Sequence, residues 1–210
     1  MHRHKRDAKA EIVEKATAIL DTYGIADLTM RRLARELDVT PGALYWHFAS
    51  KQELLGAVAD RVLEPAYPDA EPADWAARLC TICLRLRDAL LSHTDGAELV
   101  SATFAAGQSR ALKHILAALT DAATEAGVDA AHAELAARTV VYYVLGFAAD
   151  EQSRLQWDAV GALAEEQSVL RPDAAPSAAF DFGLGLLVDG IAAQRGQSIS
   201  TRSTRLSPSQ

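Results

Sequence analysis

Residues 29–48, TMRRLARELDVTPGALYWHF, constrain the fold more than any other stretch, because they predict two short helices joined by a tight turn. Apolar residues recur at three- and four-residue spacing in its first half: Met30, Leu33, Ala34 and Leu37. This spacing places them on one face of a helix. Thr40 then supplies an N-cap oxygen, and Pro41 fits the first helical position, where a missing N–H costs nothing. The second helix is short, and we expect Leu44 and Phe48 to anchor it.

Three large side chains with polar tips, Tyr45, Trp46 and His47, follow one another in this second helix. A core has no need of three such groups in a row, whereas a short helix held across a longer one can present them to the major groove of DNA. The other interpretation is an ordinary helical hairpin with an aromatic core edge. For Trp46 alone, a DNA-facing position and a core position fit the sequence equally well.

The next helix has a start signal of its own, because Ser50 and Glu53 have the spacing of a capping box. We therefore expect this helix to begin near residue 51. Lys51 would lie in its first turn, beside the short helix, where the ammonium group can meet a phosphate of DNA.

Residues 8–65 resemble the N-terminal DNA-binding domain of the TetR family of bacterial repressors. The resemblance rests on residues 28–34 (LTMRRLA), 37–39 (LDV) and 44–48 (LYWHF), followed by Lys51 and by Leu54 and Leu55. It implies a helix-turn-helix unit that contacts DNA through the following residues: Thr29, Met30, Arg31, Thr40, Pro41, Gly42, Ala43, Tyr45, Trp46, His47 and Lys51.

These residues differ in what they can offer to DNA. Arg31 is expected to read a base, since a guanidinium can donate two hydrogen bonds to a guanine edge. Phosphate contacts are assigned to four polar residues: Thr29, Tyr45, His47 and Lys51. Close apolar contacts, for example with a thymine methyl, are expected from residues that lack a hydrogen-bonding side chain: Pro41, Gly42 and Ala43.

The amino-acid composition indicates the fold class of the whole chain. Half of the 210 residues are hydrophobic, Ala is abundant, and runs rich in Val, Ile and Thr are scarce, so we expect an all-α fold. No apolar run approaches the roughly 20 residues needed to cross a bilayer. The basic N-terminus lacks the apolar segment of a signal peptide, which predicts a cytoplasmic protein that does not bind membranes.

The net charge of −7 is unevenly distributed. Residues 1–63 contain 10 Lys and Arg against 9 Asp and Glu, whereas the remainder contains 11 against 19. The acidic surplus can therefore face away from DNA phosphates, and we expect non-specific DNA binding by the first domain to be modest.

Three prolines within residues 64–72 mark a domain boundary. We expect an N-terminal three-helix helix-turn-helix DNA-binding domain over residues 1–64 and a C-terminal α-helical ligand-binding and dimerisation domain over residues 65–196. Residues 1–7 and 197–210 are expected to be disordered. Helices are predicted at 8–23, 51–64, 73–92, 97–106, 109–126, 130–153 and 176–194. Residues 154–175 are ambiguous, with a short helix at 160–169 as one option.

Two helices of the second domain have apolar stripes suited to pairing between subunits, with Gly183 allowing close approach. We expect them to form a four-helix interface in a C2 homodimer, because one short recognition helix reads too few base pairs. The other interpretation is packing inside one subunit. The expected interface residues are Ala137, Val140, Val141, Val144, Ala148, Phe180, Leu184, Leu187, Val188 and Ile191.

Residues 89–97 and 180–190 resemble the ligand-binding domain of the tetracycline-repressor branch of the TetR family. That branch binds a magnesium–drug chelate through histidines and an asparagine, and the matching positions here hold Tyr67, Ile82 and Val100. Loss of the imidazole removes a metal ligand, so we expect a more apolar effector and no metal.

The effector is expected to lie inside the C-terminal domain, with Thr103 and Asp150 as polar groups. An ordinary core is the alternative for each residue of the wall. The expected effector-binding residues are Tyr67, Ile82, Leu86, Val100, Thr103, Phe104, Leu112, Leu116, Tyr142, Phe147 and Asp150, and Tyr143 and Trp157 are further candidates for the wall.

Cys80 and Cys83 form C-x-x-C within a predicted helix, where neither a redox centre nor a zinc site is expected. We find no catalytic motif and expect no enzyme and no cofactor. The sequence therefore predicts a homodimeric DNA-binding repressor that a small effector releases from double-stranded operator DNA. The alternative is a constitutive regulator, or one that responds to a protein partner.

Overall fold

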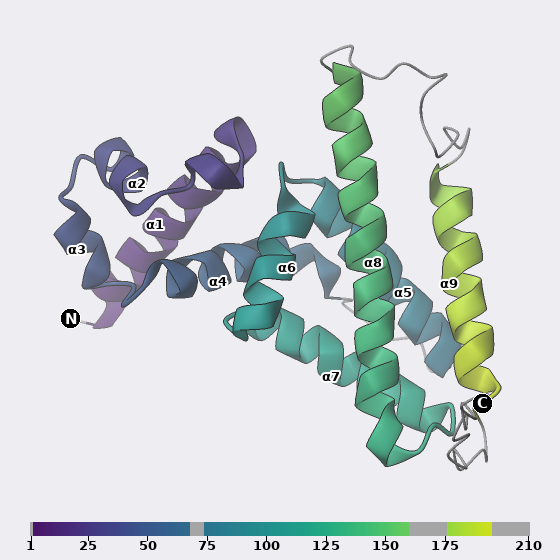
Figure 1. The fold of residues 1–210 in the computed structure, drawn as a ribbon. Coiled ribbons are helices and arrows are strands. Elements are labelled where there is room, and N and C mark those ends of the chain that lie inside the picture. Colours follow the sequence, from purple (N-terminus) through teal and green to yellow (C-terminus); the bar gives the residue numbers. More distant parts are fainter. Residues whose placement is uncertain (1, 68–73, 160–175, 195–210) are drawn as a thin grey trace, which may run out of the picture.

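The computed structural model describes residues 2–67, 74–159 and 176–194, and every regular element within these ranges is helical (Figure 1). The all-α class is thereby confirmed. The first lobe contains α1 (His2–Tyr23), η1 (Ile25–Asp27), α2 (Met30–Glu36), α3 (Pro41–Tyr45) and α4 (Lys51–Val62). A short η2 (Glu64–Ala66) leads to the second lobe, which contains α5 (Trp75–Leu91), α6 (Gly96–Ala106), α7 (Arg110–Glu125), α8 (Ala130–Ala159) and α9 (Pro176–Ala192).

Side-chain caps begin the helices of the first lobe where the sequence predicts them. Thr29 accepts a hydrogen bond from the backbone N–H of Arg32, and Thr40 accepts one from that of Ala43. Because each cap satisfies a backbone donor that the helix itself leaves free, the start of each short helix is fixed by its own sequence.

Two helices are longer than predicted. α1 begins at His2, so the expectation of a disordered arm over residues 1–7 is wrong for the part that the structure describes. No Gly or Pro interrupts residues 2–8, so the helix can begin as early as His2. α8 extends to Ala159, beyond the predicted end at 153. The possible helix at 160–169, the tail at 197–210 and most of the predicted linker lie outside the described residues, and the domain boundary stays a prediction.

The second lobe is a bundle in which α8 packs against α5, α6, α7 and α9 (Figure 1). The α8 face predicted for dimerisation is fully buried within the subunit: Ala137, Val140, Val141, Val144 and Ala148. Phe180, Leu184 and Ile191 of α9 are buried as well. The structure shows these residues in contacts inside the subunit, which was the other interpretation, and their part in a dimer interface stays a prediction. Leu187 and Val188 are half-buried.

The periodicity of an apolar stripe identifies a face that must be covered, but it does not identify what covers it. The opposite faces of α8 and α9 expose large apolar side chains, including Leu135, Tyr142, Phe182 and Leu186. The outer faces are therefore the ones available for pairing.

Gly183 brings α9 close to Tyr143 of α8. The Tyr143 hydroxyl donates a hydrogen bond to the carbonyl of Phe180 at 2.8 Å. A Cβ atom at position 183 would lie 2.8 Å from Cζ of Tyr143, closer than carbon atoms pack. Glycine therefore permits the predicted close approach, but within one subunit.

Candidate functional site

The recognition unit consists of α2, the turn after it and α3. Leu44 and Phe48 are buried beneath the short helix, as predicted, and Leu33 is buried on the facing side of α2. The turn places Asp38 at φ 53°, and the backbone N–H of Val39 donates to the carbonyl of Ala34 at 2.9 Å. Asp tolerates this left-handed conformation better than most residues, so the turn is tight without glycine. α3 is thereby held across α2 with its other side free.

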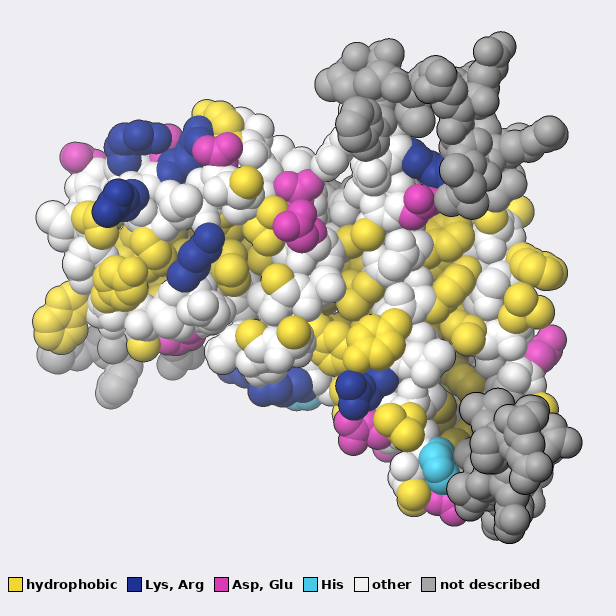
Figure 2. Space-filling model, viewed as in Figure 1, with side chains coloured by type: hydrophobic (Ala, Val, Ile, Leu, Met, Phe, Trp, Pro, Cys, Tyr) yellow, Lys and Arg dark blue, Asp and Glu magenta, His cyan; other side chains and the backbone are white. Residues whose placement is uncertain are grey.

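The free side carries most of the residues predicted to contact DNA. Trp46 is 83% exposed and Tyr45 is 49% exposed, so Trp46 lies outside the core. The other predicted residues on this surface are exposed or half-buried: Thr29, Arg31, Thr40, Pro41, Gly42, Ala43, His47 and Lys51. Several Lys and Arg side chains lie over this lobe in the face shown in Figure 2. The arrangement leaves a surface of polar tips and cations that can face a phosphate backbone.

Met30 is the exception among the predicted DNA contacts. Its side chain is only 8% exposed and belongs to the core with Leu33 and Ala34. The Met30 side chain therefore lies in the core, and a contact of Met30 with DNA stays a prediction. Met30 begins α2 directly after the Thr29 cap and lies three and four residues before Leu33 and Ala34, which places all three on the inner face.

Arg32 is held within the protein, in contrast to the exposed Arg31. Its guanidinium pairs with Asp27 and stacks on the ring of Tyr23 at 3.5 Å from the ring centroid. These contacts fix the start of α2 against the end of α1. Arg31 is therefore the better placed of the two neighbours to reach a base.

The start of α4 is fixed by a capping arrangement and by a cation from α1. Ser50 accepts from the backbone N–H of Glu53, and Glu53 accepts from that of Ala49 at 2.8 Å. The bond from Ala49 and the Lys9 ammonium 3.3 Å away lower the pKa of the Glu53 carboxyl. Lys9 also lies 4.7 Å from the ring centroid of Phe48. The capping signal is readable from the sequence, whereas the contribution of Lys9 requires the fold.

The residues predicted to bind an effector fall into two groups. Ile82, Leu86, Val100, Thr103 and Leu112 are buried in the bundle, and Phe104, Leu116 and Phe147 are half-buried around them. The Thr103 hydroxyl donates to the carbonyl of Val100 at 2.9 Å, so it is already satisfied within its own helix. The side chain of Trp157, a further candidate for the wall, lies outside the described part of the structure.

The remaining predicted residues lie at the surface of this subunit. The Tyr67 hydroxyl donates to the carbonyl of Ala111 at 2.6 Å, and Tyr142 is 53% exposed. Asp150 is exposed and pairs with Arg154 one turn later on α8. Asp150 is therefore not directed into the bundle as the sequence predicts, because the carboxylate finds a cation on its own helix surface.

An ion pair that was not predicted from the sequence lies inside the bundle, between Arg87 of α5 and Glu151 of α8. Both Nε and Nη2 of Arg87 donate to the Glu151 carboxylate, and the guanidinium carbon lies 5.1 Å from the ring centroid of Phe180. Arg87 is buried. The sequence contains a signal for this pair, because a charged residue, Arg87, lies on the apolar face of its helix with the buried Leu86 and Leu90.

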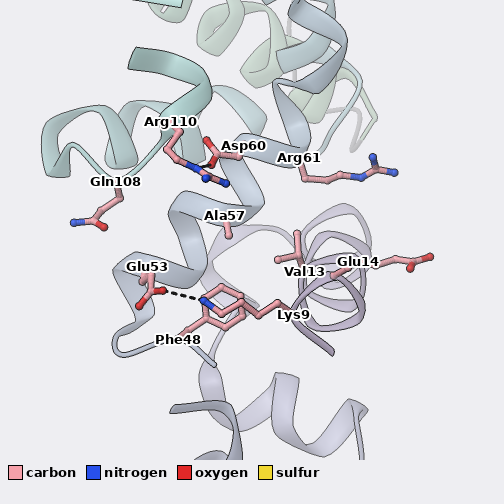
Figure 3. A pocket seen from close by; sticks show the side chains of 11 residues that line it. Lys9, Val13, Glu14, Phe48, Glu53, Ala57, Asp60, Arg61, Gln108 and Arg110 are labelled. Atoms are coloured by element: carbon pink, nitrogen blue, oxygen red, sulfur yellow. Dashed lines mark hydrogen bonds and ion pairs between the residues drawn. The ribbon is translucent and has the colours of Figure 1, made fainter. Parts of the chain in front are cut away.

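Three cavities bounded by described residues lie along α1, and none of them is lined by a residue predicted to bind an effector. The largest has a volume of about 800 Å³ and lies between α1, α4 and the turn that joins α6 to α7 (Figure 3). Lys9 and Glu53 form one wall, and Asp60 and Arg110 lie at the opposite end. It separates the two lobes over part of their junction.

Metal ligands do not gather among the described residues: no group of three His, Cys, Asp or Glu side chains there could hold an ion. Burial raises the pKa of the Cys80 and Cys83 thiols, which disfavours the thiolate that a metal or a redox centre needs. Within the same described ranges, no helix combines the length and apolarity needed to span a membrane.

The chain matches two family models that follow one another. Residues 12–58 match the bacterial regulatory proteins of the tetR family, and residues 67–195 match the tetracyclin repressor-like C-terminal domain. A tetracycline repressor protein of class A from Escherichia coli transposon 1721 is 33% identical over 198 residues, which cover 88% of this chain and 90% of the relative.

Solved structures extend the match. The crystal structure of Mycobacterium smegmatis BioQ superposes with a TM-score of 0.82 at 62% identity, covering 89% of this chain and 98% of BioQ. A structure of BioQ with its natural double-stranded DNA operator superposes with a TM-score of 0.73 at 57% identity, covering 88% and 98%. With the recognition unit described above, these matches make the chain a member of the TetR family of DNA-binding transcriptional regulators.

Proposed function

We propose that this protein is a homodimeric transcriptional repressor that leaves its operator when a small, mainly apolar effector binds in the C-terminal domain. The observation that carries the proposal is the exposed edge of α3. Tyr45 and Trp46 face outward while Leu44 and Phe48 hold the helix from below. An exposed aromatic edge beside Arg31 and Lys51 suits a helix that enters the major groove.

The outer faces of α8 and α9 support the dimer. Phe182 is 71% exposed and Leu186 is 58% exposed, and on α8 Leu135 and Tyr142 are similarly exposed. At Gly146 and Gly185 an added Cβ atom would meet nothing within 4 Å. Apolar side chains beside small residues are suited to close helix packing across a two-fold axis. Two recognition helices would then read two half-sites of one operator.

The buried part of the bundle supports a mainly apolar effector. Ile82, Leu86, Val100 and Leu112 offer only hydrocarbon surface, with Thr103 as a polar group among them. Effector binding must favour a conformer in which these helices separate, and that conformer would hold the two recognition helices at a different spacing. The effector would thereby shift the population away from DNA.

A second candidate is a regulator without a small-molecule effector. The dense burial of Val100 and Thr103 favours it, because the described bundle residues fill this region with their own side chains. A protein partner or a change in concentration would then control DNA occupancy.

The test is fluorescence anisotropy with a labelled duplex carrying the operator of the similar BioQ protein, and with the DNA upstream of this protein's own gene. Binding by one dimer at nanomolar concentration, weakened by salt, supports the DNA-binding part. A panel of apolar small molecules is then added to the complex. Release by one class of compound supports the effector, whereas unchanged affinity across the panel favours the second candidate.

A further inference from the structure

One lysine of α1, Lys9, has its ammonium group paired within the DNA-binding lobe. The ammonium nitrogen lies 3.3 Å from Oε1 of Glu53 and 4.7 Å from the ring centroid of Phe48. Figure 3 shows the side chain extended across Phe48 toward Glu53. Phe48 lies between α3 and α4, and Glu53 lies in the first turn of α4. A cation from α1 therefore supports the place where these two helices meet.

The turn between α3 and α4 (residues 46–50) has an outer side and a supported inner side. Trp46 is exposed on the outer side, and His47 beside it is half-buried. On the inner side, Glu53 Oε2 accepts from the backbone N–H of Ala49 at 2.8 Å, while Oε1 faces Lys9. The Glu53 carboxylate therefore connects the Lys9 ammonium to the backbone of this turn.

The charges on the inner side strengthen the support of the turn. The bond from Ala49 and, to a smaller extent, the Lys9 ammonium lower the pKa of the Glu53 carboxyl, so the acceptor is ionised at neutral pH. A hydrogen bond to an ionised acceptor is stronger than one to a neutral acceptor. A turn that is ordered before binding loses less conformational entropy when it meets DNA. The support behind the turn can therefore affect the strength of DNA binding.

A lysine close to DNA can strengthen a complex in two ways. A lysine that pairs with a phosphate releases a counterion, so its contribution falls as the salt concentration rises. A lysine that is already paired within the protein contributes by ordering its neighbours and displaces no counterion from the DNA. Lys9 has the second arrangement, whereas Lys51 is predicted to have the first.

We propose that Lys9 is a positioning residue for operator binding, which acts through Glu53 and Phe48 and makes no phosphate contact of its own. This role rests on the proposed DNA contacts of residues 46–51, because an ordered turn strengthens binding only if the turn meets DNA. Loss of the Lys9 charge should therefore weaken operator binding without changing its dependence on salt.

Fluorescence anisotropy with the BioQ operator duplex at several salt concentrations tests this role in the full-length protein. Lys9→Met removes the charge but keeps an apolar side chain over Phe48, and Lys9→Arg keeps the charge. Glu53→Gln can keep the bond from Ala49 but loses the attraction to the ammonium. Lys15→Met is the matched control, because it removes a cation six residues and about 9 Å further along α1.

Lys9→Met is expected to weaken operator binding about fivefold, with full stoichiometry at saturation and an unchanged slope of log affinity against log salt. Lys9→Arg should stay within about twofold of the wild type, since arginine keeps the charge. In the Glu53→Gln background, Lys9→Met should cost less than about twofold more, because the residue through which it acts is already changed. Lys15→Met should match the wild type in affinity.

Two results for Lys9→Met would overturn the inference while the wild type still binds its operator. A salt slope smaller by about one unit would show that Lys9 contacts a phosphate. Wild-type affinity would show that the charge has no part in DNA binding, and if the stoichiometry were also reduced, Lys9 would have a merely structural role. Absence of specific binding by the wild type would overturn the proposed function itself, and this role of Lys9 with it.

Discussion

Arg87 of α5 and Glu151 of α8 face each other inside the second lobe in a two-point ion pair, with nitrogen–oxygen distances of 2.7 to 3.0 Å. The pair joins α5 to α8, and Phe147 and Phe180 lie beside the guanidinium. The two charges are shielded from water by aromatic rings, which strengthens their attraction and raises the cost of separating them.

Removal of one partner of this pair is expected to destabilise the protein strongly. Glu151→Leu should lower the free energy of unfolding by about 3 kcal/mol, because it leaves the Arg87 charge buried without compensation. The double variant Arg87→Met with Glu151→Leu should cost much less than the sum of the two single changes. Urea unfolding at one fixed protein concentration measures all four proteins. Simple additivity of the two single effects would contradict the expected coupling.

Lys51→Ala tests the phosphate contact at the start of α4. We expect weaker operator binding and a slope of log affinity against log salt that is smaller by about one unit, because one fewer counterion is released. Affinity for unrelated DNA should fall by the same factor. Arg61→Ala removes a cation from the far end of the same helix and should leave the slope unchanged. Equal slopes for Lys51→Ala and the wild type would exclude the contact.

Arg31→Ala tests the base contact. Loss of a two-point bond to guanine should cost about 1–3 kcal/mol of operator affinity and should relax the base preference at one position of each half-site. Binding to unrelated DNA should change much less than for Lys51→Ala. Competition among single-base variants of the operator measures the preference, and an unrelaxed preference would assign Arg31 to the phosphate backbone.

Glu53 is expected to make the thermal stability of the first lobe depend on pH. Its pKa is lowered in the folded protein by the bond from Ala49 and by Lys9, so its stabilising effect is present above the ordinary value of 4.5 and is lost as pH falls below that value. Glu53→Gln should therefore melt at a lower temperature than the wild type at pH 7, and the difference should shrink below pH 4.5. Thermal unfolding between pH 3 and pH 7 measures it. A difference that stays constant over this range would mean that the charge of Glu53 has no part.

A charge on the outer face of α9 tests the dimer interface proposed for α8 and α9. Phe182→Glu should convert a dimer into a monomer at micromolar concentration, because the carboxylate would be buried against its own copy across the two-fold axis. Sedimentation velocity measures the change. Leu84→Glu, an exposed apolar position on α5, should leave the dimer intact. A dimeric Phe182→Glu protein would place the interface elsewhere.

The recognition unit was largely predictable because its signals are local. Thr40, Pro41 and Ser50 act on backbone groups within four residues of themselves, so their spacing in the sequence is sufficient to locate the helix starts. The spacing of Met30, Leu33 and Ala34 placed Met30 on the apolar face of its helix, and its burial confirms that placement, whereas the resemblance assigned Met30 to DNA.

The second lobe was less predictable because its contacts are distant in sequence. Arg87 and Glu151 are 64 residues apart, and Asp95 and Ile25 are 70 apart, so no spacing rule connects them. The apolar stripe of α8 does not by itself identify a dimer interface, because α8 is apolar on its inner face and also exposes Leu135 and Tyr142 on its outer face. The subunit itself covers the inner stripe.

Substitutions at Gly183 depend on the residue at position 143. A methyl group at 183 would collide with the hydroxyl end of the tyrosine, and removal of the hydroxyl alone would still leave Cζ and Cε2 within 2.9 Å of it. A lineage that acquires alanine at 183 must therefore also acquire a smaller side chain at 143, and it then gives up the bond to Phe180. Among descendants of this protein, alanine at 183 should therefore occur only together with a smaller side chain at 143.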